Sequence, residues 1–228
     1  MSNFHEMFEE GLKDIYNAEK QLTKALPKMA KMAKNPQLKQ GFENHLRQTE
    51  EQCRRIEQAC QMLGTKPTGM VCKGMKGLIE EATEHMQGLK PSACTDAELI
   101  GLAQKAEHYE IATYGTLCEW AKTMGHNEIL SLLKLNMSEE ESTDELLSQI
   151  AEGQVNQMAA KESEQMMMEE QKSGRSGGSS SRGRSSSAGR SSSSRSAGSR
   201  SSGSKSGGSG RKATTSKSKS PRGRTSVM

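Results

Sequence analysis

A repeated spacing of apolar residues, alternately three and four positions apart, constrains this sequence more than any other feature. Residues three and four apart lie on the same side of an α-helix, so a segment with this spacing can form a helix with one apolar face. Such helices must bury their apolar faces against one another. The sequence therefore predicts an all-α bundle of four long helices, over residues 3–33, 36–63, 95–124 and 127–152.

Several residues predict where these helices begin, end or bend. Pro36 suits the first turn of the second helix, and Gly64 suits its end. Thr95 and Glu98 have the spacing of a capping box at the start of the third helix. Pro27 lies inside the first segment, so we expect it to bend that helix or to interrupt its hydrogen bonding.

The connection between the second and third helices, residues 64–95, is too long for a simple turn. Its middle, residues 74–86 (GMKGLIEEATEHM), has the spacing of a short amphipathic helix. A connection of this length can cross from one end of a bundle to the other. We therefore expect a four-helix bundle with one long crossover that contains a short helix.

The composition changes sharply after residue 171. Residues 1–171 contain all 28 Asp and Glu but only 18 Lys and Arg, for a net charge of −10. Residues 172–228 contain 14 Lys and Arg, no acids, and otherwise mostly Ser and Gly. A segment of this composition cannot bury enough apolar surface to offset the entropy of ordering. We expect a folded domain over 1–171 and a disordered tail over 172–228.

The basic tail is typical of segments that bind polyanions. Its cations suit phosphate contacts, and without aromatic side chains to stack on bases they predict nucleic-acid binding that ignores base sequence. The simpler alternative is a tail that only improves solubility.

The cysteines and the hydropathy favour a cytoplasmic protein. The cysteine number is odd and no CxxC spacing occurs, which argues against a disulfide framework and a structural zinc site. No run of 18 apolar residues is present, so a membrane-spanning helix is not predicted. A reducing compartment is the expected location for the five residues concerned, Cys53, Cys60, Cys72, Cys94 and Cys118.

Acidic residues lie inside three of the four apolar stripes, where we expect them to be buried. They are Glu19 in the first segment, Glu107 and Glu110 in the third, and Glu140 and Asp144 in the fourth. A buried carboxylate is costly unless it is protonated or paired with a cation. Recurrence on three helices favours a shared metal site, although for a single acid such as Glu19 the commoner explanation is a helix rotated so that its carboxylate reaches water.

The second segment offers His45 and Glu50, which flank its stripe on opposite sides, so only one of them is expected to point fully inward. Several carboxylates and one imidazole make up the ligand set that two divalent iron or manganese ions need in a bundle core. No catalytic residue is assigned. The candidate metal ligands are Glu19, His45, Glu50, Glu107, Glu110, Glu140 and Asp144.

Four stretches carry a family resemblance: LKDIYNAEKQLTKALPKMAK, HLRQTEEQCRRIEQ, AEHYEIATYG and LLKLNMSEEESTDELL. In order and spacing they closely resemble the YciF/YciE-like branch of the ferritin-like superfamily, over residues 3–160. The resemblance implies a dimeric four-helix bundle with a long crossover that acts in bacterial stress responses. Relatives in the wider superfamily bind two iron or manganese ions and react with oxygen or peroxide. Their Glu-x-x-His pattern is absent here from the second and fourth helices.

The resemblance leaves two kinds of function open. One is a di-metal oxidase, ferroxidase or peroxidase-like enzyme in which Glu19, Glu110 and Glu140 are the inner ligands. The other is a non-catalytic structural or nucleic-acid-associated stress protein whose buried acids are protonated or solvated.

Overall fold

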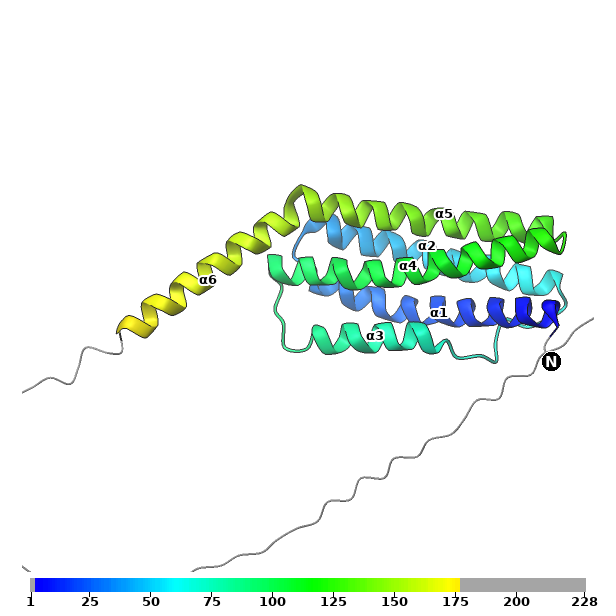
Figure 1. Cartoon of the computed structure of the whole chain (residues 1–228), viewed down its shortest axis with the longest axis horizontal. Coiled ribbons are helices and arrows are strands. Elements are labelled where there is room, and N and C mark those ends of the chain that lie inside the picture. The colour runs from blue at the N-terminus through cyan, green and yellow to red at the C-terminus, as the bar shows by residue number, and fades with distance from the viewer. Residues whose placement is uncertain (1–2, 177–228) are drawn as a thin grey trace, which may run out of the picture. The chain divides into compact units, whose positions relative to one another are not determined.

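The computed structural model describes residues 3–176, and these residues form the predicted all-α bundle (Figure 1). The crossover between its second and third long helices contains the predicted short helix, α3 (Lys73–His85). The four long helices agree closely with the predicted segments and are α1 (Phe4–Met32), α2 (Pro36–Met62), α4 (Ala93–Thr123) and α5 (Asn127–Ile150).

The chain stays helical beyond α5. One π-helical turn (Ala151–Val155) leads into α6 (Asn156–Ser176), which extends past the end of the other helices in Figure 1. The predicted domain boundary after residue 171 falls inside α6. The remainder of the tail that we predict to be disordered, residues 177–228, lies outside the described residues.

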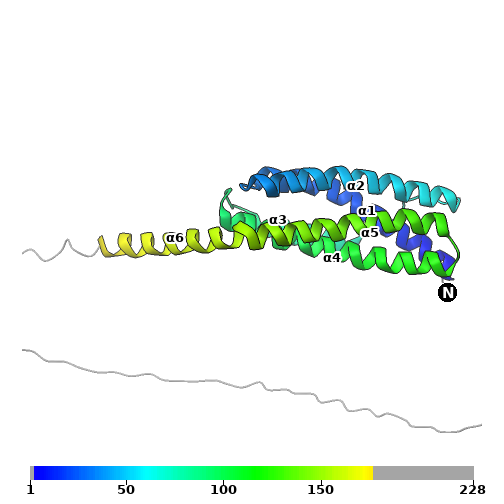
Figure 2. The same cartoon turned by 90° about the horizontal axis from the view of Figure 1, so that it is seen from above.

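The four long helices form a closed ring in which each helix packs against two others. α1 packs on α2 and α4, and α5 also packs on α2 and α4, while α3 lies against α1 and α4 (Figures 1 and 2). Because the crossover returns the chain to the end where α2 began, α2 and α4 run in the same direction. The centre of the ring is therefore lined by side chains from all four helices.

The apolar stripes build the core at both ends of this ring. Large side chains from different helices are almost completely buried there, and their close packing holds the helices in a fixed register. Examples are Leu12, Ile15, Phe42, Leu99 and Leu133.

The helix ends follow the sequence signals with one exception. α2 begins with Pro36 after the N-cap Asn35, as expected, and α1 continues through Pro27 without a break. The predicted capping box of α4 is wrong, because Ser92 is the N-cap and its hydroxyl accepts from the backbone N–H of Thr95. Glu98 instead contacts an exposed histidine of α3.

One buried carboxylate, at the start of α4, joins that helix to the turn between α1 and α2. Asp96 accepts hydrogen bonds from the backbone N–H groups of Lys34 (2.8 Å) and Asn35 (2.9 Å). Burial raises the pKa of Asp96, and these two donors oppose that shift. The contact fixes where α4 starts relative to the first helical hairpin.

We expect Asp96→Ala to lower the free energy of unfolding by about 2–4 kcal/mol, because two backbone donors lose a charged acceptor. Glu98→Ala, two residues later on the same helix, removes only an exposed ion pair and serves as the control. Urea unfolding followed by circular dichroism measures both. Equal losses in the two variants would contradict a special role for Asp96.

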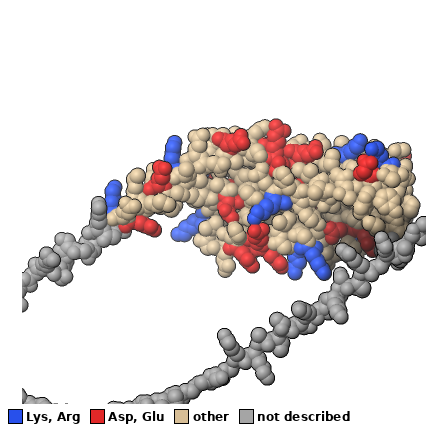
Figure 3. Space-filling model, viewed as in Figure 1, with Lys and Arg blue, Asp and Glu red and all other residues tan. Residues whose placement is uncertain are grey.

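The bundle surface carries charges of both signs. On the face shown in Figure 3, acidic side chains gather over α5 and along α3. All five cysteines are free thiols. Within residues 3–176, no helix combines the length and apolar character needed to cross a membrane.

Candidate metal centre

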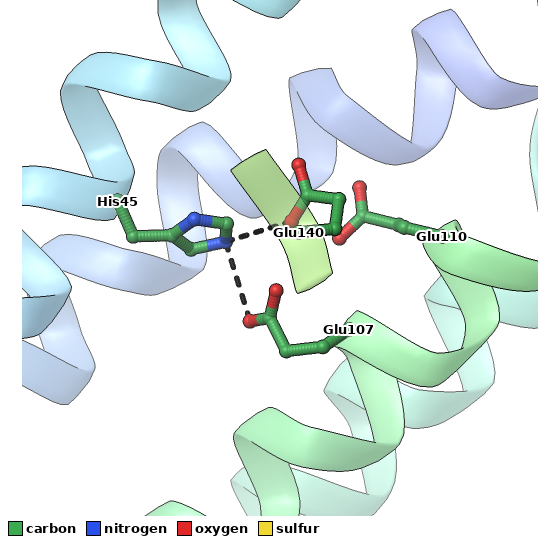
Figure 4. A group of neighbouring side chains, drawn as sticks. All are labelled: His45, Glu107, Glu110 and Glu140. Carbon is green, nitrogen blue, oxygen red and sulfur yellow. Dashed lines mark ion pairs between the residues drawn. The ribbon is translucent and has the colours of Figure 1, made fainter. Parts of the chain in front are cut away.

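Four acidic side chains and one histidine meet in the middle of the bundle. α1 supplies Glu19, α2 supplies His45, α4 supplies Glu107 and Glu110, and α5 supplies Glu140, and each is at most 2% exposed. Figure 4 shows the last four pointing toward one another. One ligand atom from each of those four lies within 4.8 Å of the others. This spacing suits a shared cation.

The imidazole of His45 is held so that one nitrogen faces the carboxylates. Its Nδ1 lies 3.4 Å from the hydroxyl of Thr143, and that hydroxyl donates its own proton to the carbonyl oxygen of Glu139. Thr143 is thus an acceptor for Nδ1–H, which leaves Nε2 with a free lone pair. Nε2 lies 3.3 Å from a carboxylate oxygen of Glu107 and 3.7 Å from one of Glu140.

The carboxylates at the centre are only partly hydrogen-bonded. Oε1 of Glu19 accepts from the hydroxyl of Tyr114, and Oε1 of Glu140 accepts from the amide of Gln52. The remaining acceptors at the centre are buried and have no hydrogen-bond partner among the described residues. They are Oε2 of Glu19, Oε2 of Glu107, both oxygens of Glu110, Oε2 of Glu140, Oε1 of Gln52 and Nε2 of His45.

Burial dominates the electrostatics of these acids. Desolvation raises the pKa of Glu107 to about 8, and it raises the pKa values of Glu19, Glu110 and Glu140 well above the usual range. Repulsion between the carboxylates adds to the shift, and at Glu110 it comes from Glu19, Glu140 and Glu107. Without a cation the folded chain therefore favours the protonated acids.

The donor set fits a divalent transition metal. Carboxylate oxygens suit manganese and iron, imidazole nitrogen suits iron and zinc, and these atoms lack the protein donors that would otherwise satisfy them. A buried acceptor without a donor costs on the order of 1–3 kcal/mol, so a cation shared by several such atoms compensates for a large penalty. The cluster could therefore hold a metal ion.

The sequence matches one protein family over most of its folded part. The family model described as "Domain of unknown function (DUF892)" matches residues 3–160. The chain belongs to the DUF892 family. The protein YciF of Escherichia coli (strain K12) is 42% identical over 160 residues, which are 70% of this chain and 96% of YciF.

Solved structures resemble this DUF892 chain as well. The E. coli stress protein YciF has 43% identity and a TM-score of 0.65, covering 68% of this chain and 99% of that one. YcfI from Rhodopseudomonas palustris, proposed to be a structural protein, has 42% identity and a TM-score of 0.63, covering 64% and 94%. A Xanthomonas campestris protein at 23% identity and a TM-score of 0.56, covering 71% and 99%, shares the fold.

The structure brings five of the seven candidate ligands of this DUF892 chain to the centre. Of the two candidates on α2, His45 points inward and Glu50 is exposed to solvent. Asp144 lies on a side of α5 that is turned away from the centre and toward α4. There it accepts a hydrogen bond from Gln104 at 3.1 Å and pairs with His108 at 3.3 Å. Glu50 and Asp144 therefore lie outside the cluster.

The sequence reasoning missed the polar residues that support the cluster from α2 and α5. Gln52, Asn136 and Thr143 are all buried and hydrogen-bonded around the centre. Their signal was available, because Gln52 follows His45 by two turns, while Asn136 and Thr143 lie one turn to either side of Glu140. Polar residues at helical spacing around a buried acid are candidates for such support.

An apolar cavity of about 40 Å³ adjoins the centre on the side covered by α3. Leu22 and Leu26 of α1, Leu78 of α3, and Ala106 of α4 are among its walls, and Glu107 is its one acidic wall residue. Small uncharged molecules would be accommodated there more readily than ions.

The raised pKa values predict how the metal-free protein responds to pH. Between pH 4.5 and about 8 the folded chain keeps a proton on Glu107 that the unfolded chain has released. The folded state then binds more protons, so the free energy of unfolding falls as pH rises through this range. Urea unfolding with a chelator present should show this fall, and Glu107→Gln should reduce its slope. A midpoint that rises with pH would contradict the assignment.

Proposed function

We propose that this protein is a cytoplasmic, homodimeric stress-response protein that holds two divalent metal ions, iron or manganese, in the centre of its bundle. Its ligands are Glu19 of α1, His45 of α2, Glu107 and Glu110 of α4, and Glu140 of α5. The observation that carries the proposal is the set of buried acceptor atoms that face one another without donors.

Charge balance supports two ions. Four ionised carboxylates at the centre carry a charge of −4, and two divalent cations neutralise that charge with the imidazole neutral. With a single divalent ion, two of the four carboxyl groups would have to keep their protons to avoid a buried negative charge. Glu110 lies close to both Glu19 and the cluster of His45, Glu107 and Glu140, so its two bare oxygens would be available to metal held by either side.

If these residues hold iron, the chemistry that the metal would supply is electron transfer to dioxygen or peroxide. The chain contributes an enclosed, largely apolar setting, because the ligands are buried and the adjoining cavity is lined mainly by aliphatic side chains. The apolar cavity suits small neutral oxidants such as dioxygen and hydrogen peroxide. We therefore propose ferroxidase or peroxidase-like oxidation as the reaction.

We expect Glu110→Ala to lower the amount of bound metal, because this residue offers two bare oxygens between the other ligands. Elemental analysis of protein purified without a chelator measures the metal-to-protein ratio. Glu50→Ala is the matched control, since Glu50 is an exposed acid on α2. The metal-to-protein ratio of Glu50→Ala should equal that of the unchanged protein. If Glu110→Ala also has the ratio of the unchanged protein, the ligand assignment is rejected.

The second candidate is a non-catalytic structural or nucleic-acid-associated stress protein. The raised pKa values favour it, because the acids can be neutral without a metal, and the similar protein YcfI is proposed to be structural. The two candidates differ in one measurement. Faster loss of ferrous ion or peroxide with the protein than with its Glu110→Ala variant favours the enzyme.

We also propose that the basic tail binds nucleic acid through phosphate contacts. It carries 14 Lys and Arg and no acids, and it lies beyond residue 160, where the family match ends. A separate basic segment on an acidic bundle would bring the metal centre to a polyanion without using the bundle surface. Peroxide consumption or iron removal beside DNA would then protect the DNA from oxidative damage.

A chain that ends at Ser176 keeps α6 whole and removes 12 of the 14 tail cations. We expect this chain to lose the shift of random-sequence DNA that the full chain produces in a gel. The affinity of the full chain should also fall steeply as salt rises, because each phosphate contact releases counterions. Equal shifts by the two chains would dismiss a role for the tail.

A further inference from the structure

Two rows of hydrogen bonds run from one ion pair near the surface to the metal centre. Arg55 of α2 and Glu139 of α5 form that pair, with two contacts of 2.7 and 2.9 Å between the guanidinium and the carboxylate. Their side chains are 17% and 24% exposed, so the pair sits at the boundary between solvent and core. A two-contact pair of this kind holds both side chains in one orientation.

The first row reaches the ligand on α1. Arg55 donates to the side-chain oxygen of Asn136 at 2.9 Å, and the amide of Asn136 donates to the hydroxyl of Tyr114 at 3.0 Å. Tyr114 in turn donates to Oε1 of Glu19. Every donor in this row points toward the centre, so the row ends on a carboxylate that acts only as an acceptor.

The second row reaches the ligand on α5. The amide nitrogen of Gln52 donates to Oε2 of Glu139 at 3.0 Å and also to Oε1 of Glu140. Glu139 therefore sets where the amide of Gln52 lies, and Gln52 sets the rotation of the Glu140 carboxylate. The two rows share the ion pair and end on ligands from two different helices.

The two rows have the same effect on the two ligands at which they end. On Glu19 and on Glu140, Oε1 is engaged by the row, and Oε2 has no hydrogen-bond partner in residues 3–176. One oxygen of each carboxylate is thus occupied by a protein donor, and the other would be available to a bound metal. We propose that the Arg55–Glu139 ion pair is a positioning pair that presents one free oxygen of each of these two ligands to the metal centre.

This inference rests on the proposed function, and the chain offers a matched control. The neighbouring residue Arg54 pairs with Glu51 at 2.6 Å, but those side chains are 67% and 45% exposed. The Arg54–Glu51 pair has a similar chemistry and its arginine is also on α2, but both of its residues belong to that helix. Within the part of the chain that the structure describes, no hydrogen bond joins this pair to the centre. Removing either guanidinium changes the net charge equally.

The test is cobalt(II) titration of the full-length protein, in which the absorption bands of the bound ion report both affinity and ligand geometry. We expect Arg55→Met to weaken cobalt binding by roughly 10- to 100-fold and to change the bands, as loss of outer support does in other metal sites. Glu139→Gln should act in the same direction. Arg54→Met should bind with the affinity and bands of the unchanged protein.

A purely structural role is separated by cutting the rows themselves. In a Tyr114→Phe/Gln52→Leu background both rows are already broken. Adding Arg55→Met should then change the cobalt affinity of that background by no more than about twofold, while still lowering its free energy of unfolding in urea. Further weakening in that background would overturn the route through the rows. Equal cobalt binding by Arg55→Met and Arg54→Met would overturn the positioning role alone. No binding by the unchanged protein would overturn the proposed function as well.

Discussion

The structure depends on compensating four carboxyl groups in the dry centre of a helical bundle. Burial alone opposes their ionised forms, and the repulsion between them adds to that cost. Each helix of the ring brings at least one of these groups or the imidazole to the same level. The crossover connects the α1–α2 hairpin to the α4–α5 hairpin, and the two hairpins pack together so that all four helices surround one point.

The compensation is built from polar side chains that lie in the apolar stripes themselves. Asn136 and Tyr114 connect α5, α4 and α1, while Gln52 connects α2 to α5. Such a network gains little net free energy, since every group in it must be desolvated. Its larger effect is on specificity, because a helix that slid or rotated by one residue would break several of these bonds at once.

Much of this arrangement could be predicted from the sequence. The three-four spacing identifies Glu19, Glu107, Glu110 and Glu140 as inward-facing, because an acid on an apolar stripe shares the direction of its neighbours. The spacing gave the wrong side for Asp144, since Asn136 and Thr143 take the inward positions on α5 and turn Asp144 to the edge. A pattern built from apolar residues cannot detect a stripe whose inward positions are polar.

The choice between His45 and Glu50, and the start of α4, needed the tertiary structure for a related reason. Both α2 residues flank the stripe equally, and only the packing of α2 against α5 places His45 beside Thr143. At α4, Ser92 and Thr95 can both cap a helix, and the contact of Asp96 with the α1–α2 turn decides where the helix begins. Local signals were present in each case, but distant contacts chose between them.

The candidate ligand set differs from the Glu-x-x-His pairs of the wider ferritin-like superfamily. Three residues after Glu140, where such a pair would place its histidine, α5 carries Thr143. That hydroxyl lies beside Nδ1 of His45, so α5 supports an imidazole from α2 rather than supplying one. The result is one nitrogen among four carboxylates. Carboxylate oxygens are ligands that suit manganese, and a mixed carboxylate and imidazole set also suits iron, so this set is compatible with the metals that we propose.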